Sequence, residues 1–347
     1  MQTQCLPAGE DTIRFGAELL RQGQLVAFPT ETVYGLGADA LNEDAVLRIF
    51  AAKGRPADNP LIVHVADIQD LASLCQVDDR SRHLMDVFWP GPLTLLLPKT
   101  PAVPSVVTAG LSTVAVRMPS HPVARALLAT CGCPVAAPSA NSSGRPSPTK
   151  AAHVMEDLQG RIPLILDGGD CEVGLESTVL DMTKDIPVVL RPGGVTPAML
   201  SPILGDVKVA DSVLRPLQAG EKALSPGMRY RHYAPCGMLT LVSGQPKRVC
   251  SVCASRYDEA LANGKSACIL AFSEHIPAYG ARYVLSIGSL NRPEEAASRL
   301  YDLLRRMDHE GIACIFSEIL PAQGMGLAVM NRLNRAASFS KIDADQE

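Results

Sequence analysis

The sequence predicts an α/β protein with two domains, and two observations support this fold class. Strand-like apolar segments alternate with amphipathic helical segments along most of the chain, and this alternation lapses once, between residues 205 and 235. A chain of 347 residues with 47% hydrophobic residues can also fill two separate cores. We therefore expect a first domain at residues 10–204, a connecting segment at 205–235 and a smaller second domain at 236–340.

The elements of the first domain follow from hydrophobic periodicity. Ile13, Ala17 and Leu20 form a helical stripe that Gly23 ends, and a buried strand follows directly. Strands are expected at residues 25–28, 59–65, 93–97, 113–117, 134–137, 164–169, 177–180 and 188–193. Helices are expected at 11–21, 43–53, 67–75, 79–88, 122–130 and 196–204.

The end of the helix expected at 43–53 places two cations, Lys53 and Arg55, close together. Asn42 is its expected N-cap, and Gly54 can leave the helix in the left-handed region while Pro56 prevents a return. Lys53 and Arg55 should therefore be held rigidly, where they suit phosphate groups and have no buried structural role. The alternative is an ordinary pair of surface cations near a helix C-terminus.

Residues 29–37, Pro-Thr-Glu-Thr-Val-Tyr-Gly-Leu-Gly, are expected to form a turn just beyond a strand end, where open α/β sheets bind ligands. Gly35 to Ala40 also matches a degenerate dinucleotide-binding fingerprint. However, the next helix starts late, and Lys53 and Arg55 occupy the region where such a site needs an acidic residue. An NAD site is therefore disfavoured.

Three further features of the first domain carry polar groups suited to binding. His64 alternates with aliphatic residues in its strand, and a satisfied core histidine is the alternative interpretation. Arg117 lies near the end of another strand and is expected to be free to hold a carboxylate. The loop at 138–149 concentrates hydroxyl and amide groups able to hold phosphate or ribose oxygens, although a flexible surface loop would have a similar composition.

The second domain is predicted to be a small Rossmann-like sheet. Strand patterns at 238–242, 267–272, 283–287 and 312–316 alternate with helical patterns at 246–263, 293–309 and 327–337. The preceding segment Ser225–Pro235 is rich in aromatic and cationic residues, which predicts a lid rather than a passive tether. No ligand is predicted for this domain.

Composition restricts the class of protein. The net charge is -4 without a long basic run, so any RNA contact should be local. No stretch reaches the roughly 18 to 20 apolar residues of a membrane span, which favours a cytoplasmic protein without membrane contact. The ten cysteines are scattered. Most should be buried thiols, and a zinc or redox role for Cys250 and Cys253 is the less favoured alternative.

Several ordered motifs identify a family. Lys53-x-Arg55 pairs with Ser139-x-Asn141, and the stretches PTETVYGLG, NPLIVHV, WPGPLT, VRMPSHP, APSANSSG, ESTV and LRPGG accompany them. In these features the chain resembles the two-domain form of the YrdC-type threonylcarbamoyl-AMP synthases along nearly its full length. The resemblance implies a twisted mixed sheet with an open concave cleft, plus a smaller C-terminal Rossmann-like α/β domain.

The resemblance also implies an activity. The family is a nucleotidyltransferase that makes L-threonylcarbamoyladenylate from L-threonine, bicarbonate or CO2, and ATP, and releases pyrophosphate. The product supplies the downstream tRNA threonylcarbamoyl-transfer machinery, which modifies tRNAs reading ANN codons. Mg2+ is expected to accompany ATP, although no carboxylate cage is evident in the sequence. The main alternative is a non-enzymatic RNA-binding module, which the acidic charge disfavours.

The site residues are carried over by motif position. The implied catalytic residues are Lys53, Arg55, Ser139 and Asn141. The implied ATP-binding residues are Arg55, Asn59, Thr113, Ser139, Ser147, Arg191 and Tyr230. The implied L-threonine-binding residues are Thr32, His64, Arg117, Ala137 and Ser177. No protein-held metal is expected.

Overall fold

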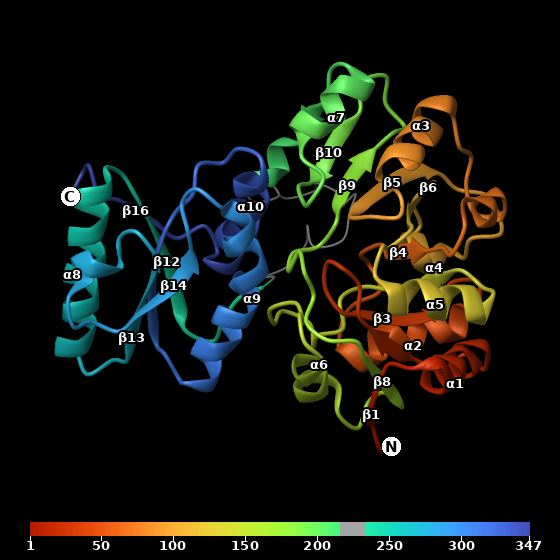
Figure 1. The fold of residues 1–347 in the computed structure, drawn as a ribbon, viewed down its shortest axis with the longest axis horizontal. Coiled ribbons are helices and arrows are strands. Elements are labelled where there is room, and N and C mark those ends of the chain that lie inside the picture. The colour runs from red at the N-terminus through yellow and green to blue at the C-terminus, as the bar shows by residue number, and fades with distance from the viewer. Residues whose placement is uncertain (216–232) are drawn as a thin grey trace. The chain divides into compact units, whose positions relative to one another are not determined.

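The computed structural model describes residues 1–215 and 233–347, which form two compact units (Figure 1). The N-terminal unit comprises chiefly residues 1–213, and the C-terminal unit comprises chiefly residues 233–347. Each unit has its own sheet and its own buried apolar cluster. The α/β fold class is therefore confirmed, whereas the boundaries at residues 204 and 236 remain predictions.

The N-terminal unit is built on a mixed sheet with the order β1-β8-β2-β3-β7-β4-β6-β5-β9-β10-β11 among the described residues. Neighbours run parallel in the pairs β1–β8, β2–β8, β4–β6, β5–β9 and β10–β11, and antiparallel in the others. The strands are β1 (Gln4–Pro7), β2 (Val26–Phe28), β3 (Gly35–Asp39), β4 (Ile62–His64), β5 (Leu93–Pro98), β6 (Thr113–Arg117), β7 (Val135–Ala136), β8 (Leu164–Asp167), β9 (Thr178–Asp181), β10 (Val188–Arg191) and β11 (Lys208–Val209).

Helices cover both faces of this sheet, because its strands alternate between two cores. In β8, Leu164 and Leu166 join a core with α1 and α5, while Ile165 joins the larger core on the opposite face. Figure 1 shows α1 and α5 side by side. The helices are α1 (Glu10–Arg21), α2 (Glu43–Lys53), η1 (Ile68–Ser73), α3 (Asp79–Phe88), α4 (Ser105–Thr108), α5 (Pro122–Cys131), α6 (Ala151–Leu158), α7 (Pro197–Leu204) and η2 (Asp211–Val213).

The predicted helix at 43–53 is confirmed with both of its ends. The Asn42 side chain accepts a hydrogen bond from the backbone of Ala45, and Gly54 has a φ of 62°. An accepting side chain at this position satisfies one of the free amides of the first turn, and a glycine adopts the left-handed conformation without Cβ strain. Lys53 is thus the last helical residue, as predicted.

The turn predicted at residues 29–37 is wrong in its second half. Gly35–Asp39 form β3, which pairs antiparallel with β2 and with β7. A Cβ atom at Gly37 would lie 2.8 Å from the ring of Phe28 and 2.8 Å from Cγ1 of Val135. The glycines that suggested a turn are therefore needed for close packing inside the sheet.

The C-terminal unit has a parallel sheet with the order β14-β13-β15-β12-β16. Figure 1 shows α8 on one side of this sheet and α9 with α10 on the other, as in a Rossmann-like layer arrangement. The strands are β12 (Met238–Ser243), β13 (Ala267–Phe272), β14 (Val284–Gly288), β15 (Cys314–Glu318) and β16 (Lys341–Asp343). The helices are α8 (Pro246–Ala262), η3 (Ile276–Tyr279), α9 (Pro293–His309) and α10 (Met325–Ala336).

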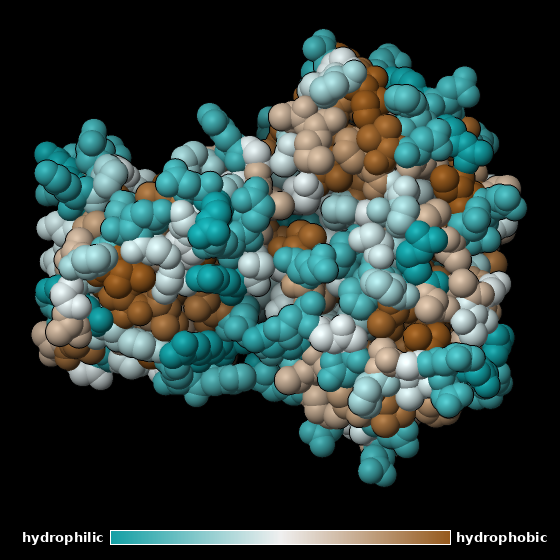
Figure 2. All heavy atoms as spheres, in the orientation of Figure 1, coloured by the Kyte–Doolittle hydropathy of each residue, from teal (hydrophilic) through white to brown (hydrophobic). Residues whose placement is uncertain are grey.

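The surface is mixed in polarity. Apolar residues reach it in separate patches (Figure 2), one of which lies over α7, the helix that carries the exposed Met199. Among the described residues, we find no helix with the length and apolar character needed to cross a membrane.

Candidate active site

Lys53 points into the N-terminal unit and is only 4% exposed. Its Nζ donates to the backbone carbonyl of Ser139 and, at 2.6 Å, to the backbone carbonyl of Asn141. The Oδ1 atom of Asn141 lies 3.4 Å away. The expectation that Lys53 has no buried structural role is therefore wrong, because the ammonium holds a loop that begins 86 residues later in the chain.

The Ser139–Asn141 segment is ordered by its own side chains as well. Ser139 Oγ donates to Asn141 Oδ1 at 2.5 Å, and Asn141 Nδ2 donates to the carbonyl of Ser142 at 2.9 Å. An isolated bridge between Gly35 and Ser139 joins the same segment to the start of β3. The structure thus brings the two predicted motifs together in one hydrogen-bonded junction, which we call the Lys53 junction (Lys53, Ser139, Asn141).

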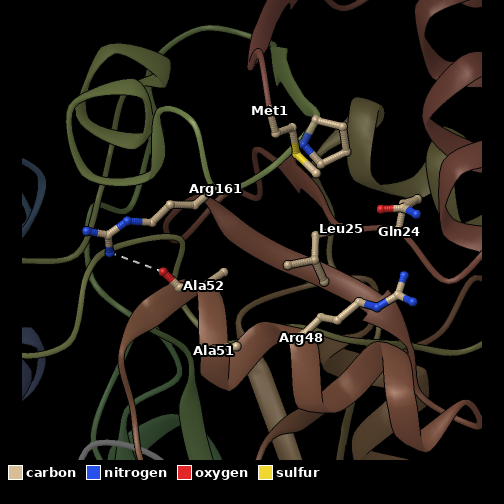
Figure 3. A pocket seen from close by; sticks show the side chains of 8 residues that line it. Met1, Gln24, Leu25, Arg48, Ala51, Ala52 and Arg161 are labelled. Carbon is tan, nitrogen blue, oxygen red and sulfur yellow. Dashed lines mark hydrogen bonds between the residues drawn. The ribbon is translucent and has the colours of Figure 1, made fainter.

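An arginine supports this junction from outside. Arg161 Nη1 donates to the carbonyl of Ala52 at 3.2 Å and lies 3.4 Å from Ser142 Oγ, so it ties the end of α2 to the residue after Asn141. Figure 3 shows the Arg161 guanidinium turned toward Ala52, while Arg48 extends along the opposite wall of a pocket of about 580 Å³. Arg48 donates to the carbonyl of Gly23 at 2.8 Å. Both cations thus contact backbone carbonyls of the fold. No local sequence pattern indicates this role of Arg161.

Arg55 lies beyond the end of α2 and is half-buried. Its Nη2 donates to the carbonyl of Asn59 at 3.0 Å, and its guanidinium carbon lies 5.7 Å from the ring centre of Phe50. Asn59 is fully buried, and neither polar atom of its side-chain amide has a hydrogen-bond partner among the described residues. A buried amide without a protein partner is costly unless another molecule satisfies it, so Asn59 is well placed for a ligand.

His64 and Arg117 end two parallel strands at the same level, since they are register partners in β4 and β6. Thr113 begins β6, and a strand of this length spans roughly 13 Å. Asn59 and Thr113 therefore lie at one end of this strand pair, and His64 and Arg117 lie at the other. Burial, followed by the charge of Arg117, lowers the pKa of His64 from 6.5 to about 3, so its ring is neutral near neutral pH.

Arg117 is not free, contrary to our expectation. Its Nη2 lies 2.7 Å from Glu31 Oε1, its Nη1 donates to Thr32 Oγ1 at 2.9 Å, and its Nε donates to the carbonyl of Gly91 at 3.2 Å. The Glu31 contact is short but lacks hydrogen-bond alignment, so it is an ion pair between two buried side chains. Glu31 was not among the predicted site residues, although it is the one carboxylate in the hydroxyl-rich stretch 29–34.

Ser177 and Arg191, which were assigned to different substrates, are in direct contact. Arg191 donates from Nε to the carbonyl of Ser177 at 3.0 Å and from Nη2 to its Oγ at 3.1 Å. The neighbouring Glu176 accepts a hydrogen bond from Ser147 Oγ at 2.5 Å. Ala137 donates its backbone amide to the carbonyl of Ile62 at 2.9 Å, which places it beside β4. Residues of the two predicted subsites therefore adjoin one another.

Two family models match nearly the whole chain. Residues 18–193 match the Sua5, YciO and YrdC family model, whose description reads telomere recombination. Residues 195–338 match a model described as the C-terminal domain of threonylcarbamoyl-AMP synthase. The chain belongs to the Sua5, YciO and YrdC family.

Relatives within this Sua5, YciO and YrdC family match both units. The threonylcarbamoyl-AMP synthase of Bacillus subtilis is 48% identical over 334 residues, covering 96% of this chain and 94% of the relative. The protein of the same name from Pyrococcus abyssi is 46% identical over 335 residues, covering 95% of each chain. A crystal structure of P. abyssi Sua5 complexed with L-threonine has a TM-score of 0.92 and 44% identity, and covers 99% of this chain and 98% of that one. The predicted family and fold class are confirmed.

One predicted ATP-binding residue, Tyr230, lies outside the described residues. Most of the predicted lid Ser225–Pro235 lies outside them as well. From that segment the structure describes residues 233–235. Tyr233 is buried and stacks on Tyr301, with ring centres 5.3 Å apart. The guanidinium carbon of Arg332 lies 6.0 Å from the centre of the Tyr233 ring. The Tyr233 ring thus packs within the C-terminal unit.

Proposed function

We propose that this chain is an L-threonylcarbamoyladenylate synthase, which converts L-threonine, bicarbonate and ATP into the adenylate and pyrophosphate. The observation that carries the proposal is the Lys53 junction, which joins the Lys-x-Arg and Ser-x-Asn motifs. Relatives that carry the name threonylcarbamoyl-AMP synthase match this chain over nearly its full length, which supports the same assignment. A reaction between bound anions needs positioning and charge stabilisation rather than a covalent nucleophile.

The nucleotide is assigned to the side of the site that holds Arg55, Asn59 and Thr113. Asn59 offers an amide without a protein partner among the described residues, and the guanidinium of Arg55 is fixed beside it. Lys53 contributes a positive charge behind the loop while it orients the donors of Ser139 and Asn141. The proposed ATP-binding residues also include Ser147 and Arg191, together with Tyr230, which lies outside the described residues.

L-threonine is assigned to the side that holds Thr32, His64, Arg117, Ala137 and Ser177. A free amino acid carries adjacent opposite charges, and the buried pair of Arg117 and Glu31 presents the complementary charges 2.7 Å apart. We assign the carboxylate of threonine to Arg117 and its ammonium group to Glu31. The neutral ring of His64 adds no competing positive charge near the ammonium group.

The proposed chemistry has two steps. The threonine nitrogen forms a carbamate with bicarbonate, which releases one water and one net proton, and Glu31 is placed to accept that proton. A carbamate oxygen then attacks the α-phosphorus of ATP, and pyrophosphate leaves. In the second step Lys53 and Arg55 stabilise the charge that develops on the phosphates.

Mg2+ is proposed to arrive with ATP, where it neutralises charge on the leaving pyrophosphate. In the N-terminal unit, the described residues include no compact group of three potential metal-binding side chains. Nucleotide oxygens and water would therefore supply most of the ligands.

We further propose a cytoplasmic location, and a downstream tRNA threonylcarbamoyl-transfer machinery as the consumer of the product.

The deciding experiment measures pyrophosphate release from ATP with threonine and bicarbonate each present or omitted, together with mass-spectrometric detection of the adenylate. We expect release that requires both small substrates and matches the adenylate formed. RNA binding without any pyrophosphate release would instead favour the alternative RNA-binding module, and pyrophosphate release that does not require threonine would contradict the assigned substrate.

A further inference from the structure

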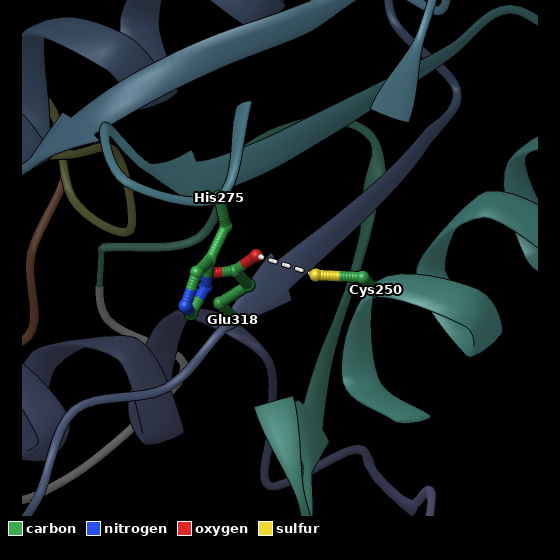
Figure 4. Close-up of side chains that lie close together, drawn as sticks. All are labelled: Cys250, His275 and Glu318. Carbon is green, nitrogen blue, oxygen red and sulfur yellow. Dashed lines mark hydrogen bonds and ion pairs between the residues drawn. The ribbon is translucent and has the colours of Figure 1, made fainter. Parts of the chain in front are cut away.

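Three potential metal-binding side chains meet at the carboxyl edge of the parallel sheet in the C-terminal unit. Glu318 ends β15, His275 follows β13, and Cys250 lies in the first half of α8. Figure 4 shows His275 beside the Glu318 carboxylate and the Cys250 thiol directed at a carboxylate oxygen. This edge is where open parallel α/β sheets usually bind ligands.

The three groups are close enough to share one ion. His275 Nδ1 lies 2.8 Å from Glu318 Oε2, and Cys250 Sγ lies 3.9 Å from Glu318 Oε1. All three ligand atoms lie within 4.8 Å of one another. Tetrahedral zinc with ordinary bond lengths separates its sulfur and oxygen ligands by about 3.5 Å. Small side-chain rotations would therefore place the three atoms around a metal.

Glu318 is held as a metal-binding carboxylate usually is. Its side chain is 3% exposed, and it accepts hydrogen bonds from the Phe272 amide at 3.1 Å and from the Tyr279 hydroxyl at 2.5 Å. Such outer contacts fix the orientation of a ligand before the metal arrives. Among the described residues, no lysine or arginine lies within ion-pair distance of Glu318, so none competes for the carboxylate.

The cluster also has an open side. A cavity of about 500 Å³ is lined by Cys250 and His275 together with Lys247, Ser251 and Glu274. The cavity offers a path of entry and room for a fourth ligand such as water. Cys253, the other cysteine of the Cys-x-x-Cys stretch, is fully buried in the apolar cluster of this unit and takes no part.

We propose that Cys250, His275 and Glu318 form a binding site for a divalent transition metal, best matched by Zn2+. One thiolate, one imidazole and one carboxylate with an open fourth position is a donor set typical of zinc, and the sulfur disfavours Mg2+ and Ca2+. On binding, the Cys250 thiol releases its proton to water, and the imidazole of His275 carries its proton on Nε2 so that Nδ1 is available to the metal. This site is independent of the proposed synthase activity.

The test uses the full-length protein after exhaustive chelation, titrated with Co2+ as a spectroscopic probe and then with Zn2+ as competitor. We expect one equivalent of Co2+ to produce a thiolate-to-cobalt charge-transfer band that Zn2+ removes. Cys250→Ser should abolish the band, and His275→Gln should weaken Co2+ binding at least about tenfold.

Two matched controls lie in the same unit. Cys236 and His309 are both exposed and belong to no cluster of this kind among the described residues, so Cys236→Ser and His309→Gln should bind as the unmodified protein does. Circular dichroism checks that every variant is folded. A band that persists in folded Cys250→Ser, or no band in the unmodified protein, would show that the three side chains form only a hydrogen-bonded network.

Discussion

At the scale of single residues, the site depends on two buried charges whose partners are parts of the protein. The Lys53 ammonium binds the carbonyls of the 139–141 loop, and the Arg117 guanidinium binds Glu31 and Thr32. Each cation therefore holds neighbouring parts of the site in place and also contributes a positive charge to the site. Substitution of either residue should change local order as well as catalysis.

Lys53→Ala should reduce adenylate formation by roughly 100- to 1,000-fold, because loss of its fixed charge and of the loop order that it maintains should remove on the order of 2 to 4 kcal/mol of transition-state stabilisation. It should also lower the free energy of unfolding by about 1 to 3 kcal/mol, since buried loop carbonyls lose their donor. Steady-state kinetics and urea unfolding measure the two effects. Lys184→Ala, at an exposed lysine, is the control and should change neither. Unchanged turnover in Lys53→Ala would remove the residue from the mechanism.

Arg117→Lys should raise the KM for threonine more than the KM for ATP, because lysine cannot reproduce a two-point grip on a carboxylate. Glu31→Gln should act in the same direction, since it removes the negative partner of the threonine ammonium group. Both constants are obtained by varying one substrate while the other is saturating. Equal effects of Arg117→Lys on the two substrates would mean that Arg117 is assigned to the wrong one.

His64 should give the protein an acid-sensitive component of stability. Its folded-state pKa of about 3 lies below the ordinary value of 6.5, so its contribution is complete above pH 6.5 and is lost as the pH falls toward 3. Between pH 7 and pH 4 the unmodified protein should lose about 3 kcal/mol more unfolding free energy than His64→Gln. Urea unfolding at several pH values measures this difference. The exposed His83→Gln variant should follow the unmodified protein, and a His64→Gln curve that does so too would contradict the assigned burial effect.

At the scale of elements, the sequence predicted those parts whose signals are local. The helix at 43–53 has its cap, its apolar face and its terminal glycine within a dozen residues, and the structure matches each of them. In contrast, the glycines of β3 locally resemble a turn, whereas Gly37 serves close packing against Phe28 and Val135, which are remote in sequence or on other strands. The pairing of Arg117 with Glu31 was missed for the same reason. It depends on where the 29–34 stretch folds, which no local pattern reports.

Gly37→Ala should test the packing role of β3. The added Cβ would lie 2.8 Å from both Phe28 and Val135, so the sheet must shift and the free energy of unfolding should fall by about 1 to 3 kcal/mol. Thermal or urea unfolding gives the change. Gly9→Ala is the matched control, since its nearest neighbour would be Thr12 Oγ1 at 4.0 Å. Equal stability of the two variants would show that β3 does not need a glycine.

At the scale of the whole molecule, the predicted lid over 225–235 remains a prediction. The adenylate is a mixed anhydride, and a closed cleft would protect it from water. Opening the cleft should therefore increase hydrolysis of the adenylate. Replacement of residues 229–232 with glycine and serine leaves the packed Tyr233 in place. This replacement should lower the amount of adenylate obtained per pyrophosphate released and weaken ATP binding. Parallel assays of both products with saturating threonine measure this yield. A variant with unmodified yield and ATP dependence would identify the segment as a tether.

The position of β8 in the sheet has a consequence for synthesis on the ribosome. β8 lies between β1 and β2, yet Leu164, which pairs with both Gln4 and Val26, is translated long after them. At ordinary elongation speeds the intervening chain takes roughly ten seconds to emerge. Throughout this interval the facing edges of β1 and β2 have no partner strand. A nascent chain of this protein therefore exposes strand edges that invite aggregation, and its folding yield should depend on translation speed and on chaperones that shield them.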